Sequence, residues 1–364
     1  MRTGCIATIG LLLALAGTAW AEPRIEHFDV FTSGTDGYAA YRIPAIEAAA
    51  DGSLVAFCEA RKYNLSDPGF GEQDIDLACK RSTDGGRTWS AMQIIEDPGE
   101  LWSAANPATV LDRESGRLWL LYLRSRPGRS TRTSRPGTDD MQTHARYSDD
   151  HGVTWSEPID LTAVARDVDD PAWRASVVGP GGAIQDRHGR LLAPIWKVDP
   201  PGVFAIFSDD RGKTWQRGAM VPGEGVGNEN QLVELADGRI LMDVRQRGGP
   251  HRWMATSRDG GKTWSEARPG ETVTPVACAI ERLALSPSRI VWTGPKGNKR
   301  ADLVLRVSSD EAKTFPEEHL VYEGLAAYSD LTRLGDNTVG ILWERGVERG
   351  YQFITFTRFD LGAR

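Results

Sequence analysis

Short runs of alternating apolar and polar residues recur along the chain, and five of them lead into the same turn-like phrase. The phrase follows the pattern S-x-D-x-G-x-T-W at residues 81–89, 147–155, 207–215 and 256–264, with a degenerate copy at 307–315. The runs before it are rich in β-branched and aromatic residues, which is typical of strands. The five aspartates, Asp84, Asp150, Asp210, Asp259 and Asp310, are 66, 60, 49 and 51 residues apart, and this period indicates a repeated structural unit.

Each copy of the phrase has the residues of a tight turn between two strands. Ser and Asp side chains bond nearby backbone N–H groups, Gly permits a positive φ, and Thr and Trp lead back into an extended segment. We therefore predict an all-β fold, a six-bladed β-propeller of four-stranded antiparallel blades. Turn formation and core packing account for the Asp and Trp of the phrase, so we expect its residues to have no catalytic role.

Three further segments complete this picture. Strand-like stretches lie outside the five copies near the beginning (24–33) and at the end (351–360) of the chain. Because an incomplete blade would expose strand edges, we expect both stretches to share the sixth blade. The widest gap between copies holds a hydrophilic stretch, residues 125–145, which we interpret as an inserted loop at the rim of the site.

The first 21 residues resemble a secretory signal peptide. A single basic residue precedes an apolar run at 6–16, and small residues lead to an expected cleavage site before Glu22. The run is too short for a comfortable membrane span, although an uncleaved anchor is the alternative. We therefore expect a secreted or periplasmic mature chain without a membrane span. Its residues, 22–364, would form one propeller domain of six units of about 57 residues each.

Charge, cysteine and histidine content limit the partners, disulfides and metal sites that we expect. Cleavage removes Arg2 and no acidic residue, which changes the formal net charge from −7 to −8 with histidine neutral. A chain this acidic is not expected to bind nucleic acid. Cys58 and Cys79 lie on neighbouring predicted strands and are able to pair in an oxidising compartment, but with Cys278 the count is odd, which favours buried free thiols. The six histidines are scattered, and we expect no metal site.

Several motifs outside the repeats occur in a fixed order. They are YRIP (41–44), EARKYNLSDPGFGEQD (59–74), GNENQ (227–231), MDVRQ (242–246), KRADL (299–303) and AAYSDL (326–331). In order and spacing they resemble the exo-α-sialidase (neuraminidase) family of bacterial and animal enzymes with Asp-box repeats, over residues 41–344. The resemblance implies a glycoside hydrolase that removes terminal sialic acid from glycoproteins, glycolipids or oligosaccharides with retention, through a tyrosyl-enzyme intermediate. It requires no cofactor, and we expect a monomer.

The resemblance also implies how the substrate is held. Sialic acid carries a carboxylate on its anomeric carbon, and planar guanidinium groups match a carboxylate better than lysine does. The family motifs assign this cradle to three arginines, Arg42, Arg245 and Arg300. Lys299 and Arg306 are neighbours that compete for the role of Arg300. Arg61 corresponds to an additional substrate-binding arginine near the ring hydroxyls.

The same carboxylate disfavours an acidic nucleophile, because two like charges would meet at the anomeric carbon. Sialidases use a tyrosine instead, and Tyr328 matches it. Since a phenol has a pKa of about 10, it needs a neighbouring base, and Glu229 matches this partner. Asp67 matches the general acid that protonates the leaving group. Asp74 and Asp76 compete for this role, although Asp76 is predicted to lie in a strand.

Alternative functions remain from other classes. An intramolecular trans-sialidase, or a transferase that passes the sugar to another glycan, would share all of these residues. Another propeller glycosidase or a lyase would not need the carboxylate cradle. A noncatalytic carbohydrate-binding propeller would not need the tyrosine, the glutamate and the aspartate together.

Overall fold

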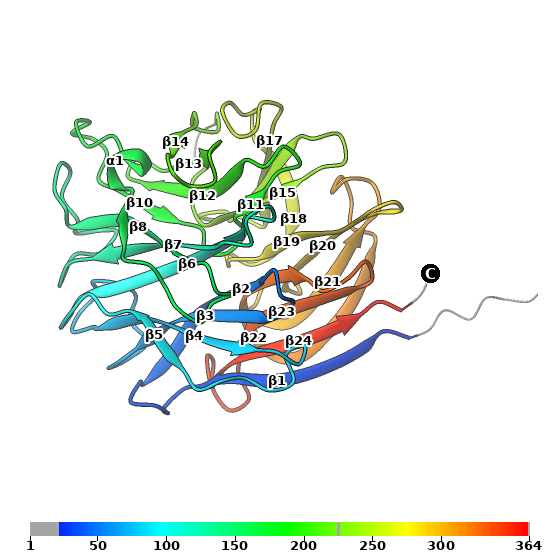
Figure 1. Cartoon of the computed structure of the whole chain (residues 1–364). Helices are drawn as coiled ribbons and strands as arrows, with labels where there is room; N and C mark the ends of the chain where they lie inside the picture. Colours follow the sequence, from blue (N-terminus) through cyan, green and yellow to red (C-terminus); the bar gives the residue numbers. More distant parts are fainter. Residues whose placement is uncertain (1–21, 224–225, 363–364) are drawn as a thin grey trace, which may run out of the picture.

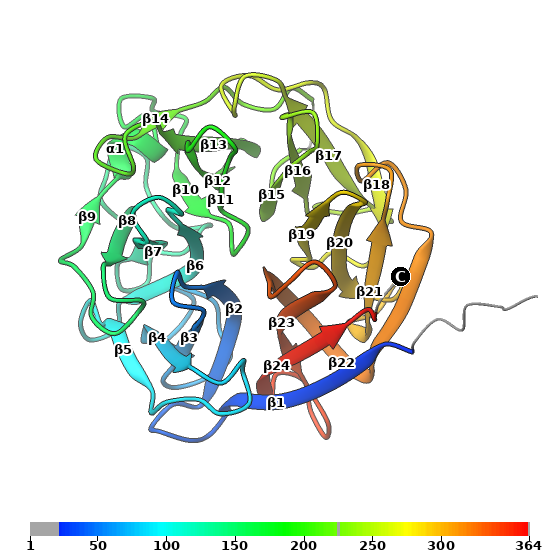
Figure 2. The ribbon, with the colours of Figure 1, turned by 45° about the vertical axis from the view of Figure 1, so that its right-hand side comes forward.

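The computed structural model describes residues 22–223 and 226–362 and is a ring of strands (Figures 1 and 2). Residues 1–21, where we expect the signal peptide, lie outside the described residues. Antiparallel blades surround a central axis, with an inner strand beside the axis and an outer strand at the rim (Figure 2). The described residues contain one short helix, α1 (Thr162–Ala165). No helix among the described residues is long and apolar enough to cross a membrane.

The described residues form six blades, which confirms the predicted propeller. Blade 1 contains β2 (Ala40–Ala48), β3 (Leu54–Arg61), β4 (Ile75–Ser82) and β5 (Gln93–Glu96), and blade 2 contains β6 (Ser103–Leu111), β7 (Leu118–Ser125), β8 (Met141–Ser148) and β9 (Ile159–Asp160). Blade 3 contains β10 (Ala175–Val178) and β11 (Ile184–Gln185) as a split inner strand, then β12 (Leu191–Val198), β13 (Gly202–Ser208) and β14 (Gln216–Arg217). Blade 4 contains β15 (Asn230–Glu234), β16 (Ile240–Val244), β17 (His251–Ser257) and β18 (Arg268–Thr272).

The last two blades share one long strand. Blade 5 contains β19 (Ala279–Leu285), β20 (Ser288–Pro295), β21 (Ala301–Ser308) and the first part of β22 (Glu317–Arg333). The second part of β22 is the inner strand of blade 6, followed by β23 (Thr338–Arg345), β24 (Phe353–Asp360) and β1 (Arg24–Thr32). β22 changes partner between Leu325, which lies opposite Ala301 of β21, and Ala326, which lies opposite Arg345 of β23.

The two ends of the chain close the ring. β1 pairs antiparallel with β24, from Arg24 opposite Asp360 to Thr32 opposite Phe353. The prediction that the terminal segments share the sixth blade is thereby confirmed. The pairing covers the edge of β24, which would otherwise present free N–H and C=O groups.

Each copy of the repeated phrase is a turn between the third and fourth strands of a blade. In the third copy, Ser208 accepts a hydrogen bond from the N–H of Gly212 at 2.7 Å, and Asp210 accepts from the N–H and the hydroxyl of Thr214 at 2.8 and 2.7 Å. The bonds from Thr214 lower the pKa of the Asp210 carboxyl to about 2. In the fifth copy Ala312 adopts the same conformation at φ +56° and donates the same bond to Ser308, so this turn forms without glycine.

The aromatic residue at the end of each phrase packs against the preceding blade. Trp155 of blade 2 lies edge-on to Phe57 of blade 1 at 5.6 Å, and Trp215 of blade 3 lies edge-on to Trp119 of blade 2 at 6.0 Å. Trp89 of blade 1 meets Phe356 of blade 6 in the same way at 5.5 Å. The main hydrophobic clusters therefore lie between neighbouring blades, where sheets pack face to face.

Strand direction decides which ends of the blades meet at each mouth of the ring. Inner strands such as β2 begin at one mouth, second strands such as β3 return to it, and third strands such as β4 leave it again. The repeated turns follow third strands and so lie at the opposite mouth. Their position agrees with the expectation that they are structural.

Cys58 and Cys79 are buried free thiols in the described part of the chain, as is Cys278. In the pairing of β3 with β4, Cys58 lies opposite Ala78, whereas Cys79 lies opposite Phe57. Since directly opposed residues share a face, the two sulfur atoms point to opposite faces of blade 1. This geometry excludes the disulfide that the sequence left open.

The inserted loop is shorter than predicted. Residues 126–140 connect β7 to β8, but residues 141–145 belong to β8, which pairs with β7 along its whole length. Met141, Thr143 and Ala145 alternate into the core of blade 2, and this buried face makes the segment a strand despite its polar neighbours.

Candidate active site

All seven residues predicted for the site lie at one mouth of the ring. Arg42 is near the beginning of β2, Arg61 is the last residue of β3, and Asp67 lies in the loop between β3 and β4; Glu229 precedes β15, Arg245 follows β16, Arg300 precedes β21, and Tyr328 is the third residue of the inner part of β22. Blades 1, 4, 5 and 6 thus contribute to one site, because each inner strand begins at this mouth and each second strand ends there.

Tyr328 and Glu229 form a buried pair with Arg245. The Tyr328 hydroxyl donates to Glu229 Oε1 at 2.6 Å, and Arg245 Nη1 donates to Glu229 Oε2 at 2.5 Å and to the Tyr328 oxygen at 2.6 Å. Burial and the Glu229 carboxylate raise the pKa of Tyr328, while Arg245 and Arg42 oppose that shift. The phenol is therefore protonated in the resting site and lies in contact with a base.

Three guanidinium groups surround the Tyr328 ring. The Cζ atoms of Arg42, Arg245 and Arg300 lie 5.2, 5.8 and 5.5 Å from the centre of the ring. They come from blades 1, 4 and 5, so the chain brings together cations that are far apart in sequence. The arrangement is suited to binding a carboxylate beside the phenolic oxygen.

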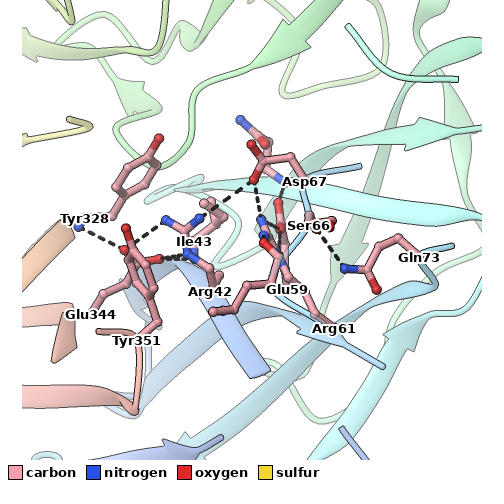
Figure 3. A network of polar contacts seen from close by, with 12 residues as sticks. Arg42, Ile43, Glu59, Arg61, Ser66, Asp67, Gln73, Tyr328, Glu344 and Tyr351 are labelled. Carbon is pink, nitrogen blue, oxygen red and sulfur yellow. Dashed lines mark hydrogen bonds and ion pairs between the residues drawn. The ribbon is translucent and has the colours of Figure 1, made fainter. Parts of the chain in front are cut away.

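Arg42 is held by Glu344, which the sequence analysis did not identify. Arg42 Nε and Nη2 donate to the two Glu344 oxygens at 2.9 and 3.1 Å, and the backbone N–H groups of Ile43 and Tyr328 donate to the same carboxylate at 3.0 and 3.2 Å (Figure 3). Burial disfavours the charge of Arg42, but Glu344 together with Tyr328 and Tyr351 outweighs this effect and raises the pKa of Arg42. One buried carboxylate thus positions an arginine of the cradle and the backbone of the tyrosine.

Tyr351, in the loop between β23 and β24, is a second residue that the sequence analysis missed. Its ring lies 4.1 Å from the Arg42 guanidinium, and its hydroxyl accepts a hydrogen bond of 2.8 Å from Arg300 Nη1. It therefore contacts two of the three arginines. The competitor Arg306 instead forms ion pairs with Glu271 and Glu318 at 2.5 and 3.0 Å, which favours Arg300.

Asp67 stands above Arg42 and Arg61 (Figure 3). Its side chain is 63% exposed, and its Oδ1 lies 3.1 Å from Arg61 Nη2 and 3.7 Å from Arg42 Nη1. Arg61 is fully buried and is fixed by two bonds to Glu59, which is also buried, at 2.9 and 2.6 Å. This geometry leaves one face of the Asp67 carboxyl free for a ligand.

The competing aspartates have other partners. Asp76 lies in β4, as predicted, and accepts a 2.5 Å hydrogen bond from Tyr38, while burial raises its pKa to about 6. Asp74 pairs with Lys62 at 3.3 Å. Neither of these contacts involves an arginine of the cradle, so the geometry favours Asp67.

The missed residues had one visible signal. Glu59 and Glu344 are acidic residues near the ends of otherwise apolar strands, in the segments LVAFCEAR and TVGILWER. A charge within a buried strand requires a partner. The sequence indicates that such a partner exists, but not which residue it is.

The opposite mouth has a different character. A cavity of about 810 Å³ opens there, lined by the ends of the inner strands, and none of the seven candidate residues belongs to its described lining. Its wall includes Glu47 and Glu281, and burial raises the pKa of Glu281 to about 7. The lining also includes three arginines, but Arg113 bonds to backbone carbonyls, while Arg282 and Arg333 pair with Glu311 and Asp336. No tyrosine belongs to the described lining, so we place the candidate active site at the other mouth.

Comparisons with known proteins agree with the fold. A family model described as BNR repeat-like domain matches residues 52–341. A sialidase of Micromonospora viridifaciens is 32% identical over 94% of this chain and 55% of that protein, and a sialidase of Bacteroides fragilis is 29% identical over 90% of this chain and 64% of that protein. The solved structure of a Hadza microbial sialidase, Hz136, has a TM-score of 0.83 at 29% identity and is matched over 92% of this chain and 68% of that chain.

These comparisons differ in how much of each relative they cover. The chain spans 55% and 64% of the two curated sialidases, so each relative has further sequence beyond the matched part. The family model covers most of this chain, in agreement with the resemblance in its motifs. The chain therefore belongs to the BNR-repeat family and is a relative of the bacterial sialidases.

Proposed function

We propose that the protein is a secreted exo-α-sialidase that hydrolyses terminal sialic acid from glycoproteins, glycolipids or oligosaccharides. The main support for this proposal is that three guanidinium groups lie within 6 Å of the centre of the Tyr328 ring, while Glu229 accepts a hydrogen bond from the Tyr328 hydroxyl. A site that binds a carbohydrate without a carboxylate would not require this concentration of positive charge. The sialidase relatives support the same substrate class.

In the proposed first step, Arg42, Arg245 and Arg300 bind the substrate carboxylate beside the anomeric carbon. Tyr328 Oη forms a bond to that carbon while its proton passes to Glu229, which lies 2.6 Å away. Arg245 donates to the Tyr328 oxygen and to Glu229 Oε2, the carboxylate oxygen that does not take the proton, and it stabilises the negative charge that develops on the phenol. The raised pKa of Tyr328 makes the base necessary, since few molecules carry a free phenolate at neutral pH.

Asp67 completes this step by protonating the leaving oxygen as the glycosidic bond breaks. Its exposed carboxyl faces solvent, where the remaining glycan would leave, and Arg61 and Arg42 restrict its position. In the second step Asp67 accepts a proton from water, the water oxygen attacks the anomeric carbon, and the bond to Tyr328 Oη breaks. Glu229 then returns the proton to the phenolate, and two displacements give retention at the anomeric carbon.

The proposal is tested with purified protein and an aryl sialoside, with aryl galactoside and aryl glucoside as controls. We expect release of the aryl group from the sialoside and none above background from the two neutral sugars. Equal hydrolysis of a neutral glycoside would favour another propeller glycosidase, and binding without turnover would favour a carbohydrate-binding propeller. Mass analysis of the product separates free sialic acid from the anhydro sugar of an intramolecular transfer.

Secretion belongs to the same proposal and has its own test. Expression in a bacterial host, followed by N-terminal sequencing of the exported protein, is expected to give a chain that begins at Glu22. A protein that remains in the cytoplasm with residues 1–21 attached would contradict it.

A further inference from the structure

The loop that carries Asp67, residues 62–74, contains a tight turn at the acid itself. The N–H of Phe70 donates to the carbonyl of Asp67 at 3.0 Å, Pro68 occupies the second position, and Gly69 occupies the third at φ +70°. These are the features of a type II turn, which requires a positive φ at its third residue. We call residues 62–74 the acid loop. The direction of the Asp67 side chain depends on this turn.

Gly69 lies against the backbone of another blade. A Cβ atom at Gly69 would lie 2.2 Å from the carbonyl oxygen of Arg129 and 2.6 Å from the nitrogen of Ser130. Both contacts are to backbone atoms, so a flexible side chain cannot move away to make room. Arg129 and Ser130 belong to the connection between β7 and β8, residues 126–140, which we call the insertion loop.

The insertion loop is a well-bonded support. Asp140 is fully buried and accepts two hydrogen bonds from the Arg135 side chain at 2.9 Å and one from its backbone N–H at 3.0 Å. Ser130, also fully buried, accepts a 2.8 Å bond from the N–H of Ser134. The two ends of the loop are joined by a bond of 2.9 Å from the N–H of Arg126 to the carbonyl of Asp140. Such a loop is able to resist displacement.

The acid loop is also held by bonds within itself and by Arg61 of blade 1. The buried Gln73 amide donates to the carbonyls of Asn64 and Ser66 at 3.0 and 2.8 Å (Figure 3), and Arg61 Nη1 donates to the carbonyl of Leu65 at 2.5 Å. These bonds fix the segment before Asp67. The segment after it, beginning at Gly69, contacts the insertion loop instead.

We propose that the insertion loop of blade 2 is a positioning element for Asp67 and that it acts through the close contact between Gly69 and residues 129–130. The contact seats the turn, and the turn directs the carboxyl. Arg132 adds a second contact, since its guanidinium lies 5.5 Å from the centre of the Phe70 ring. The inference rests on the proposed role of Asp67 as the general acid.

The test compares Gly69→Ala with the matched control Gly71→Ala. Gly71 has nearly the same φ of +67°, but a Cβ atom there meets nothing within 4 Å, so the control carries the same backbone strain without the collision. Each variant is assayed on sialyllactose, whose leaving group needs a proton, and on an aryl sialoside, whose leaving group needs little help. The ratio of kcat/KM for sialyllactose to kcat/KM for the aryl sialoside reports how well the leaving group is protonated, and it does not depend on the amount of folded protein.

For Gly69→Ala we expect the ratio of sialyllactose to aryl sialoside activity to fall at least about tenfold, because a misplaced general acid loses part of its usual 10²–10⁴-fold effect. For Gly71→Ala we expect the ratio to stay within about twofold of the wild-type value. Arg132→Ala, at an exposed residue, tests the proposal without the risk of misfolding and is expected to lower the ratio by about threefold.

Asp67→Ala distinguishes a failure of the positioning inference from a failure of the proposed role of Asp67. If it lowers the ratio, while neither Gly69→Ala nor Arg132→Ala differs from Gly71→Ala, the positioning inference is overturned and the proposed function stands. If Asp67→Ala itself leaves the ratio unchanged, Asp67 is not the general acid and both are overturned.

Discussion

Replacement of Glu344 by glutamine tests whether the buried carboxylate organises the site. Glu344 is 1% exposed, and its two oxygens each accept two hydrogen bonds: Oε1 from Arg42 Nε and the N–H of Ile43, and Oε2 from Arg42 Nη2 and the N–H of Tyr328. Glutamine has nearly the same shape but only one acceptor oxygen. In either orientation its NH₂ group faces two of the four donors.

The expected cost follows from those contacts. Two buried donors lose their acceptor at about 1–3 kcal/mol each, and removing one partner of a buried ion pair costs about 3–5 kcal/mol in total. Because the glutamine oxygen keeps two of the bonds, we expect the lower part of that range, about 3 kcal/mol of unfolding free energy. The donors that face the NH₂ group would also move apart, and a shift of about 1 Å in the cradle lowers kcat/KM by about 100-fold.

The assay pairs urea unfolding, followed by tryptophan fluorescence, with hydrolysis of an aryl sialoside. Asp243→Asn is the matched control, because Asp243 is fully buried and binds Arg252 at 2.7 and 2.8 Å without contacting a residue of the candidate site. We expect both variants to lose stability and only Glu344→Gln to lose activity beyond the loss of folded protein. If Glu344→Gln unfolds and turns over like the wild type, the assigned role of this carboxylate is wrong.

Three further predictions concern the nucleophile, the cradle and pH. Tyr328→Phe is expected to lower turnover of an aryl sialoside more than about 10³-fold while binding of an unsaturated sialic acid analogue, measured by calorimetry, changes little; wild-type-like hydrolysis would remove Tyr328 from its role. Arg42→Ala is expected to raise KM and lower kcat together, in steady-state kinetics, because the carboxylate loses a charge-assisted contact; an unchanged KM would argue against the cradle. Burial raises the pKa of Glu281 to about 7 in the folded protein, so its protonated form favours folding at low pH and this contribution is lost as pH rises through 7. Glu281→Gln is therefore expected to raise the melting temperature at pH 8 but not at pH 4, and an equal change at both pH values would contradict the raised pKa.

Features set by neighbouring residues were predictable from the sequence. Each repeated turn depends on bonds within five residues, such as those from Thr214 to Asp210, so a short pattern reveals it. The alternation of apolar and polar residues in the terminal segments likewise predicted β1 and β24. The bonds from Arg42 to Glu344 join residues 302 positions apart, and no local pattern encodes that pairing. The contact of Gly69 with the insertion loop escaped for the same reason, since glycine in a turn does not reveal which backbone lies above it.

The junction between blades 5 and 6 differs from the others in a way that bears on mobility. At the other five junctions an aromatic side chain of one blade packs against the preceding blade, whereas here the unbroken strand β22 passes from one blade to the next between Leu325 and Ala326. Tyr328 follows only two residues after that passage. Because one β-strand belongs to both blades, the proposed nucleophile lies at the junction where a continuous strand limits local opening of the ring. In hydrogen exchange, the amides around Tyr328 should therefore be among the slowest in the protein.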